Sequence, residues 1–126
     1  MDKRIKLGLD QDRIIDITTN GRKTGAPRRI EIWFFNIAGK IFITGTPGAR
    51  DWYANVLANP EIIFHLKHSV RADIPAICTP VTDIEERRLI FLSIFHILNE
   101  DRDLKEYIKH SPLIEVNLNT ANTCIG

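Results

Sequence analysis

Short β-rich runs joined by very brief connections limit most strongly how this chain can fold. Residues 28–35 and 40–44 form two such runs with four residues between them, and residues 61–66 and 69–78 form a second pair. Strands this close in sequence pair antiparallel, because a parallel pair needs a crossover of roughly a dozen residues or more. With about six strands and few helices, the pattern predicts a mainly β (α+β) antiparallel barrel rather than a doubly wound sheet.

The remaining segments are expected to complete one domain at residues 13–126, preceded by a polar arm at residues 1–12. A chain of 126 residues has the length of a single domain. Residues 13–19 and 113–118 alternate between apolar and polar side chains, as the first and last strands of a half-buried sheet would.

Three helices are expected, at residues 51–58, 83–98 and 101–110. Asp51 and Asp83 are suitable N-caps for the first two. The charged run at residues 85–88 predicts a solvated face on the longest helix. Its apolar side is predicted at Ile84, Leu89, Ile90, Leu92, Ile94, Phe95 and Leu98.

Charge and cysteine usage exclude several classes of function. The 17 basic and 16 acidic residues give a net charge of +1, whereas nucleic-acid-binding proteins usually carry a larger positive surplus. No apolar stretch is long enough to span a membrane, and the N-terminus does not resemble a secretory signal. Cys78 and Cys124 form no CxxC pair and no histidine lies in an HExxH motif, so we expect no metal site and a cytoplasmic protein with free thiols.

The segment at residues 18–29, Thr-Thr-Asn-Gly-Arg-Lys-Thr-Gly-Ala-Pro-Arg-Arg, is the strongest indication of a binding site. It holds four cations, three threonine hydroxyls and two glycines, without one acidic residue. Glycines let backbone N–H groups approach a ligand closely, and lysine and arginine bind phosphate oxygens. The alternative is a solvated basic turn. The glycine–lysine order and spacing do not match a Walker loop.

Together with Trp-Tyr-Ala-Asn-Val-Leu-Ala-Asn-Pro at residues 52–60, this segment resembles the two signatures of the deazaflavin-dependent nitroreductase family. The resemblance extends over about residues 13–118. It implies a split β-barrel related to the pyridoxamine-phosphate-oxidase-like, FMN-binding proteins. It also implies binding of coenzyme F-420, a deazaflavin with a phosphate and a polyglutamate tail.

The resemblance implies roles for particular side chains. The phosphate and tail would be held by Arg22, Lys23, Thr24 and Arg28. The ring system would lie beside the strand that carries Arg29, Ile30 and Trp33. The pocket would be completed by Thr44, Gly45, Thr46, Pro47, Trp52, Tyr53 and Asn55. Apart from the resemblance, two proton sources for the acceptor stay open, solvent and Tyr53. One ring of the Trp52–Tyr53 pair is expected to pack inward and the other to face the ligand.

The function implied is an oxidoreductase that passes a hydride from reduced deazaflavin to a small electron-poor acceptor, such as a quinone, an enone or a nitroaromatic. Two alternatives stay open: the same barrel binding FMN, and a non-catalytic carrier of a flavin or a fatty acid. A homodimer is expected, because a small barrel would leave strand edges and the aromatic residues around Trp33 uncovered.

Overall fold

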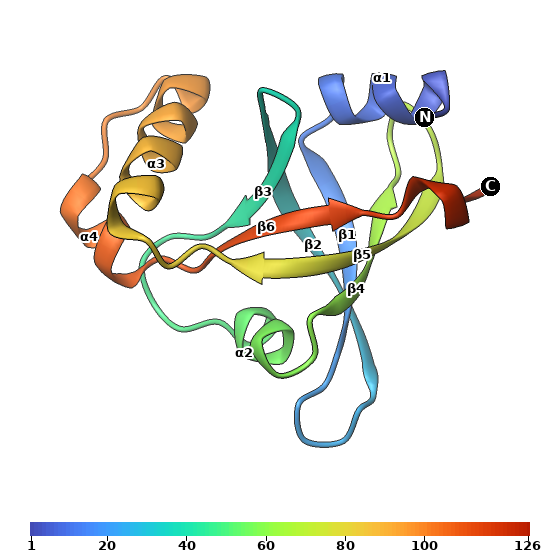
Figure 1. Ribbon diagram of the computed structural model, residues 1–126, viewed down its shortest axis with the longest axis horizontal. Helices are drawn as coiled ribbons and strands as arrows, with labels where there is room; N and C mark the ends of the chain where they lie inside the picture. The colour runs from blue at the N-terminus through green and yellow to red at the C-terminus, as the bar shows by residue number, and fades with distance from the viewer.

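Six antiparallel strands close into a barrel in the computed structural model, which describes residues 1–126 (Figure 1). The strands are hydrogen-bonded in the order β4–β1–β2–β3–β6–β5, and β5 pairs again with β4 to close the ring. Their bounds are β1 (Ile14–Asn20), β2 (Pro27–Ile37), β3 (Lys40–Thr44), β4 (Glu61–Leu66), β5 (Ala72–Pro80) and β6 (Leu113–Leu118). The predicted antiparallel barrel is confirmed.

Four helices surround the barrel: α1 (Lys3–Gln11), α2 (Asp51–Ala58), α3 (Ile84–Leu98) and α4 (Leu104–His110). A 3-10 turn, η1 (Thr120–Asn122), and a two-residue strand, β7 (Cys124–Ile125), end the chain, with β7 paired to β5. Figure 1 shows α3 and α4 together on one side of the barrel, whereas α1 lies on the other. No helix combines the length and the hydrophobicity that a membrane span requires.

Strand β2 separates two hydrophobic cores, because successive side chains along a strand point to opposite faces. Phe34 points into the barrel and packs at the edge of Phe64, with ring centroids 5.3 Å apart. Phe35 points the other way, into a second core that α3 and α4 cover with Phe91, Phe95 and Tyr107. The helix pair is therefore attached to the barrel through the outer face of β2.

Residues 1–12 differ from the polar arm expected there, because α1 places Ile5 and Leu9 in the barrel core. These two apolar residues are four apart and so share one helix face, while the charged residues of the helix, Lys3, Arg4, Lys6 and Asp10, face solvent. The Asn36 amide donates to the Leu9 carbonyl at 3.1 Å and ties α1 to the β2–β3 hairpin.

Helix α3 begins at the predicted cap but turns a different face inward. The Asp83 carboxylate accepts a hydrogen bond from the Glu86 N–H at 2.9 Å. Three residues of the predicted apolar side, Ile84, Leu89 and Leu92, are exposed. The buried face consists of Arg87, Ile90, Phe91, Ile94 and Phe95. Residues 89–95 are apolar nearly all round the helix, so hydrophobic periodicity alone could not select the buried face.

A cluster of charges crosses the outer face of the barrel. Lys67 Nζ lies 2.7 Å from Asp16 Oδ1, and Arg29 Nε lies 2.9 Å from Asp16 Oδ2. Partial burial acts to raise the pKa of Asp16, but the hydrogen bonds from Lys67 and Arg29 outweigh it and hold this pKa below its usual value. Charged Asp16 therefore stabilises the folded chain.

We expect Lys67→Met to lower the melting temperature at pH 7 by a few degrees. The folded-state pKa of Asp16 is depressed, so its contribution is present above the unfolded pKa of about 4 and is lost as the pH falls through the folded value. The difference between the variant and wild type should accordingly shrink below about pH 3. Thermal melts between pH 2 and 8 measure this. Arg88→Met, which removes an exposed helix pair with Glu85, is the control and should change little.

Candidate functional site

The basic segment predicted as a binding site forms a polar cavity of about 270 Å³ between the β1–β2 loop and α2. We call it the loop cavity, and it is lined by Gly21, Arg22, Lys23, Thr24, Arg28, Asp51 and Asn55. No hydrophobic residue lines it. Gly25 closes the loop in a left-handed conformation, with φ of 73°, which glycine adopts without strain.

Asn55 fixes the loop to α2. Its buried side-chain oxygen accepts hydrogen bonds from the Arg22 backbone N–H at 3.1 Å and from Arg22 Nη1 at 2.9 Å. Its amide nitrogen donates to Thr19 Oγ1 at 3.3 Å. The oxygen and the nitrogen of this buried amide both have hydrogen-bond partners, and the backbone at the start of the loop is held in place.

The cations of the loop divide into two kinds. Arg22 is bound within the protein, by Asn55 and by an ion pair of 3.3 Å with Asp51. Asp51 is the first residue of α2 rather than its N-cap, which is Arg50, so its carboxylate is available for this pair. Lys23 and Arg28 line the cavity and make no hydrogen bond or ion pair with the protein. Two cations are therefore available to an anionic ligand.

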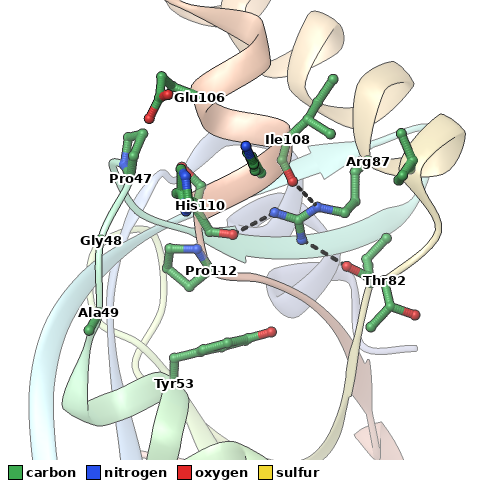
Figure 2. Close-up of a pocket in the computed structure, with 14 residues that line it drawn as sticks. Pro47, Gly48, Ala49, Tyr53, Thr82, Arg87, Glu106, Ile108, His110 and Pro112 are labelled. Carbon is green, nitrogen blue, oxygen red and sulfur yellow. Dashed lines mark hydrogen bonds between the residues drawn. The ribbon is translucent and has the colours of Figure 1, made fainter.

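A larger hollow of about 640 Å³, the central cavity, lies between the segment Pro47–Ala49, Tyr53 of α2, the residues after β5 and the C-terminal end of α4 (Figure 2). Tyr53 extends into it from α2, beneath the Arg87 guanidinium. The Tyr53 hydroxyl makes no hydrogen bond with the protein. It is therefore free to donate to, or accept from, a bound molecule.

Arg87 forms part of the wall of the central cavity, although its side chain belongs to the charged run predicted to be solvated. That prediction is wrong for Arg87, which is 7% exposed. Its guanidinium donates to the carbonyls of Val81, Tyr107, Ile108 and Ser111 at 2.6–3.2 Å. The last carbonyls of a helix have no intrahelical donor, so Arg87 satisfies the end of α4. Burial lowers the pKa of Arg87, which still remains charged at neutral pH.

The third hollow is a groove of about 210 Å³ between the outer face of the barrel and the helix pair. We call it the aromatic groove, and its walls are Trp33, Phe35, Thr44, Gly45, Thr46, Ile94, Phe95, Leu98, Arg102 and Tyr107. Trp33 is 47% exposed, an unusual degree for the largest apolar side chain, and the Arg13 guanidinium lies 5.9 Å from its ring centre.

The predicted site residues are thus distributed among three hollows along the segment from Thr44 to Asn55. Lys23, Arg28 and Asn55 line the loop cavity, with Arg22 and Thr24. Pro47 and Tyr53 line the central cavity, and Trp33, Thr44, Gly45 and Thr46 line the aromatic groove.

Three predicted residues line none of these hollows. Arg29 points to the outer face and pairs with Asp16, while Ile30 packs against the barrel core. Trp52 is 8% exposed and belongs to that core, with its ring centre 5.8 Å from that of Tyr53 in an edge-on arrangement. One ring of the pair therefore packs inward, as expected, and the other, Tyr53, lines the central cavity.

Sequence reasoning missed Arg87 and Ser111, and the contribution of α4 to the central cavity. The spacing along α3 could have indicated that Arg87 is buried. It lies four residues after the Asp83 cap and three before Ile90, which places it on the same helix face as the buried Ile90. Ser111 carried no signal, because only the turn from α4 into β6 brings it beneath the Arg87 side chain.

A family model described as F420H(2)-dependent quinone reductase matches residues 4–99 of the chain. The fold is similar to that of a putative pyridoxamine 5'-phosphate oxidase from Listeria innocua, with a TM-score of 0.73 and 13% identity over 97% of this chain and 94% of that one. A putative 5-nitroimidazole antibiotic resistance protein from Bacteroides thetaiotaomicron aligns with a TM-score of 0.70 and 13% identity, over 94% and 81% of the two chains. A structure described as an F420 reductase aligns with a TM-score of 0.70 and 15% identity, over 94% of each chain. The barrel is therefore the split barrel of these proteins.

Proposed function

The chain belongs to the F420H(2)-dependent quinone reductase family, and we propose that it passes a hydride from reduced coenzyme F-420 to a small electron-poor acceptor. It is a deazaflavin-dependent oxidoreductase. The bound deazaflavin supplies the hydride chemistry, and the protein supplies binding, orientation and exclusion of water. The observation that carries the proposal is the pair of unpartnered cations in the loop cavity.

The loop cavity fits the anionic end of the cofactor. Lys23 and Arg28 are exposed side chains that would bind phosphate and carboxylate oxygens, the groups with which lysine and arginine form charge-assisted hydrogen bonds. The one carboxylate in the cavity, Asp51, is already paired with Arg22, so its repulsion of an anion is reduced. Asn55 would act as a positioning residue, because it holds the Arg22 backbone in place.

The segment Thr44–Pro47 would lie against the ring system. It borders both the aromatic groove and the central cavity, since Thr44, Gly45 and Thr46 line the aromatic groove and Pro47 lines the central cavity. An acceptor in the central cavity would then be next to the ring and to Tyr53.

Tyr53 would deliver the proton that the acceptor needs after it has received a hydride. General acids act within hydrogen-bond reach of the acceptor atom. The Tyr53 hydroxyl lines the central cavity and has no partner in the protein that would have to be displaced.

We also propose a homodimer and a cytoplasmic location. Pairing of β4 with β5 closes the barrel, so open strand edges no longer support the dimer. Support comes instead from exposed apolar side chains on the outer faces of β2, β4 and β5, namely Trp33, Ile63 and Ile77. The cytoplasmic location is supported by the free thiols of Cys78 and Cys124, since disulfides are typical of oxidising compartments.

Lys23→Ala combined with Arg28→Ala should weaken coenzyme F-420 binding by about 100-fold, because each cation loses charge-assisted hydrogen bonds to the cofactor. The melting temperature should stay close to that of wild type, since neither side chain has a partner in the protein. Titration at low and high salt measures this, and binding to wild type should weaken as salt rises. The matched control is Lys40→Ala with Arg71→Ala, which removes two exposed cations outside the cavity. Equal affinity in wild type and the loop variant would show that the loop is a solvated turn.

Tyr53→Phe should slow quinone reduction by about 100-fold and leave cofactor affinity unchanged, because only the proton-donating hydroxyl is removed. The phenyl ring keeps the edge-on contact with Trp52, so the variant should fold normally. Single-turnover oxidation of bound reduced cofactor by a quinone gives the rate. An unchanged rate would assign the proton to solvent. No oxidation of the cofactor in wild type, despite binding, would identify a carrier.

Light scattering at micromolar concentration should give twice the chain mass of 14.4 kDa. Ile63→Asp should halve the measured mass without unfolding the chain, because it places a charge in a surface that the partner would desolvate. A wild-type mass near 14.4 kDa would contradict the dimer.

A further inference from the structure

The wall of the central cavity contains a serine whose hydroxyl has no hydrogen-bond partner. Ser111 is 5% exposed, and its Oγ is the one buried side-chain nitrogen or oxygen in the chain that lacks a partner. Burying a hydroxyl without a hydrogen bond destabilises a protein, so such groups are rare and call for an explanation. Ser111 lines the cavity, and rotation of its closed-off hydroxyl toward a ligand oxygen there would satisfy it.

Arg87 in the same wall is a buried cation without a carboxylate partner. A guanidinium has five N–H groups, and four of those on Arg87 are bound to backbone carbonyls. One N–H on Nη1 has no acceptor in the protein. Carbonyl dipoles reduce the cost of burying the charge but do not neutralise it. Capping of α4 explains the three bonds to Tyr107, Ile108 and Ser111, and the fourth joins Arg87 to Val81 after β5, but the remaining N–H and the net charge stay unexplained.

The other charged groups around the cavity do not cancel this charge. Glu106, Lys109 and His110 also line it, all exposed on α4, so solvent screens them more strongly than Arg87. Glu106 is the only acidic residue among the lining residues, and Lys109 offsets it. The buried guanidinium therefore leaves a positive potential within the cavity.

We propose that Arg87 and Ser111 form an anion-binding subsite that selects acceptors carrying a negatively charged oxygen group, such as a carboxylate or a sulfonate, beside the reducible ring. This inference rests on the proposed function for the role of the cavity as the acceptor site. The four carbonyl bonds hold the guanidinium in a fixed orientation before the ligand arrives, so little reorganisation is needed on binding. At about 640 Å³, the cavity has the size of a site for a two-ring molecule.

Two probes that differ by one fixed charge test the subsite: 1,4-naphthoquinone and 1,4-naphthoquinone-2-sulfonate. Calorimetric titration of the full chain without cofactor should give at least tenfold tighter binding of the sulfonate. Ser111→Ala should weaken sulfonate binding about tenfold and leave binding of the neutral quinone unchanged, since one hydrogen bond to a charged group is lost. The same substitution should raise the melting temperature, because it removes an unsatisfied buried hydroxyl.

Ser93→Ala on α3 is the matched control and should alter neither probe. Arg87→Lys keeps the charge but has only three donors, so it should weaken sulfonate binding as well. If Arg87→Lys does not fold, the titrations of Ser111→Ala with the two probes test the subsite by themselves. Equal affinity for the two probes, or sulfonate binding that Ser111→Ala leaves intact, would overturn the subsite.

A coenzyme F-420 titration on the same proteins separates the two proposals. Normal cofactor binding by Ser111→Ala, with lost sulfonate binding, supports both. Failure of wild type to bind the cofactor would overturn the proposed function, while the comparison of the two probes would still decide whether the anion subsite exists.

Discussion

The alternation of side chains along β2 is the constraint on which the rest of the structure depends. This strand is the longest of the barrel, and it contributes to both hydrophobic cores at once. On one face, Arg28 reaches the loop cavity and Phe34 the barrel core. On the other, Trp33 reaches the aromatic groove and Phe35 the second core. A register shift of one residue would exchange every one of these positions, so the packing that fixes the fold also fixes the site.

The segment from Thr44 to Asn55 connects the three hollows, because its residues line each of them. It begins at the end of β3, where Thr44 Oγ1 donates to the Pro112 carbonyl, and it ends in α2, where Asn55 holds the basic loop. Arg50 holds the turn between them by donating to the Thr46 carbonyl at 3.1 Å. The proposed cofactor-binding and acceptor-binding surfaces are thus connected by twelve residues of continuous chain rather than by a domain interface.

Local sequence signals predicted those parts of the structure that depend on neighbours in sequence. The hairpins, the Asp83 cap and the strand at residues 113–118 follow from turn residues, a capping carboxylate and alternation, all of which act over a few residues. The basic loop was found because its cations, glycines and threonines are contiguous. The division of its cations into bound and free ones could not be predicted, since it depends on Asn55 and Asp51, which lie 33 and 29 residues from Arg22.

Tertiary packing decided the positions that were mispredicted. Arg87 sits in a run of four charged residues, and charged side chains are rarely buried without a partner of opposite charge. Three of its four partners are carbonyls at the end of a helix 20–24 residues away, which no composition or periodicity reveals. Likewise, Ile5 and Leu9 are two apolar residues in a charged segment, and only the open end of the barrel gives them a core to join.

The central cavity combines features that reduce stability but suit a site that binds anions. A core built for stability alone would place an apolar residue at Ser111 and a neutral donor at Arg87, because an unsatisfied hydroxyl and an uncompensated charge both weaken the fold. The hydrogen bonds of Arg87 offset part of this cost, since its guanidinium binds four carbonyls and joins α3 to the end of α4 and to Val81 after β5. One side chain therefore both attaches the helix pair to the barrel and keeps a positive charge in the cavity. Replacing Ser111 by alanine would remove this cost without disturbing a single hydrogen bond of its side chain, so the fold gives no reason for a hydroxyl at this position, whereas the proposed anionic ligand would give one.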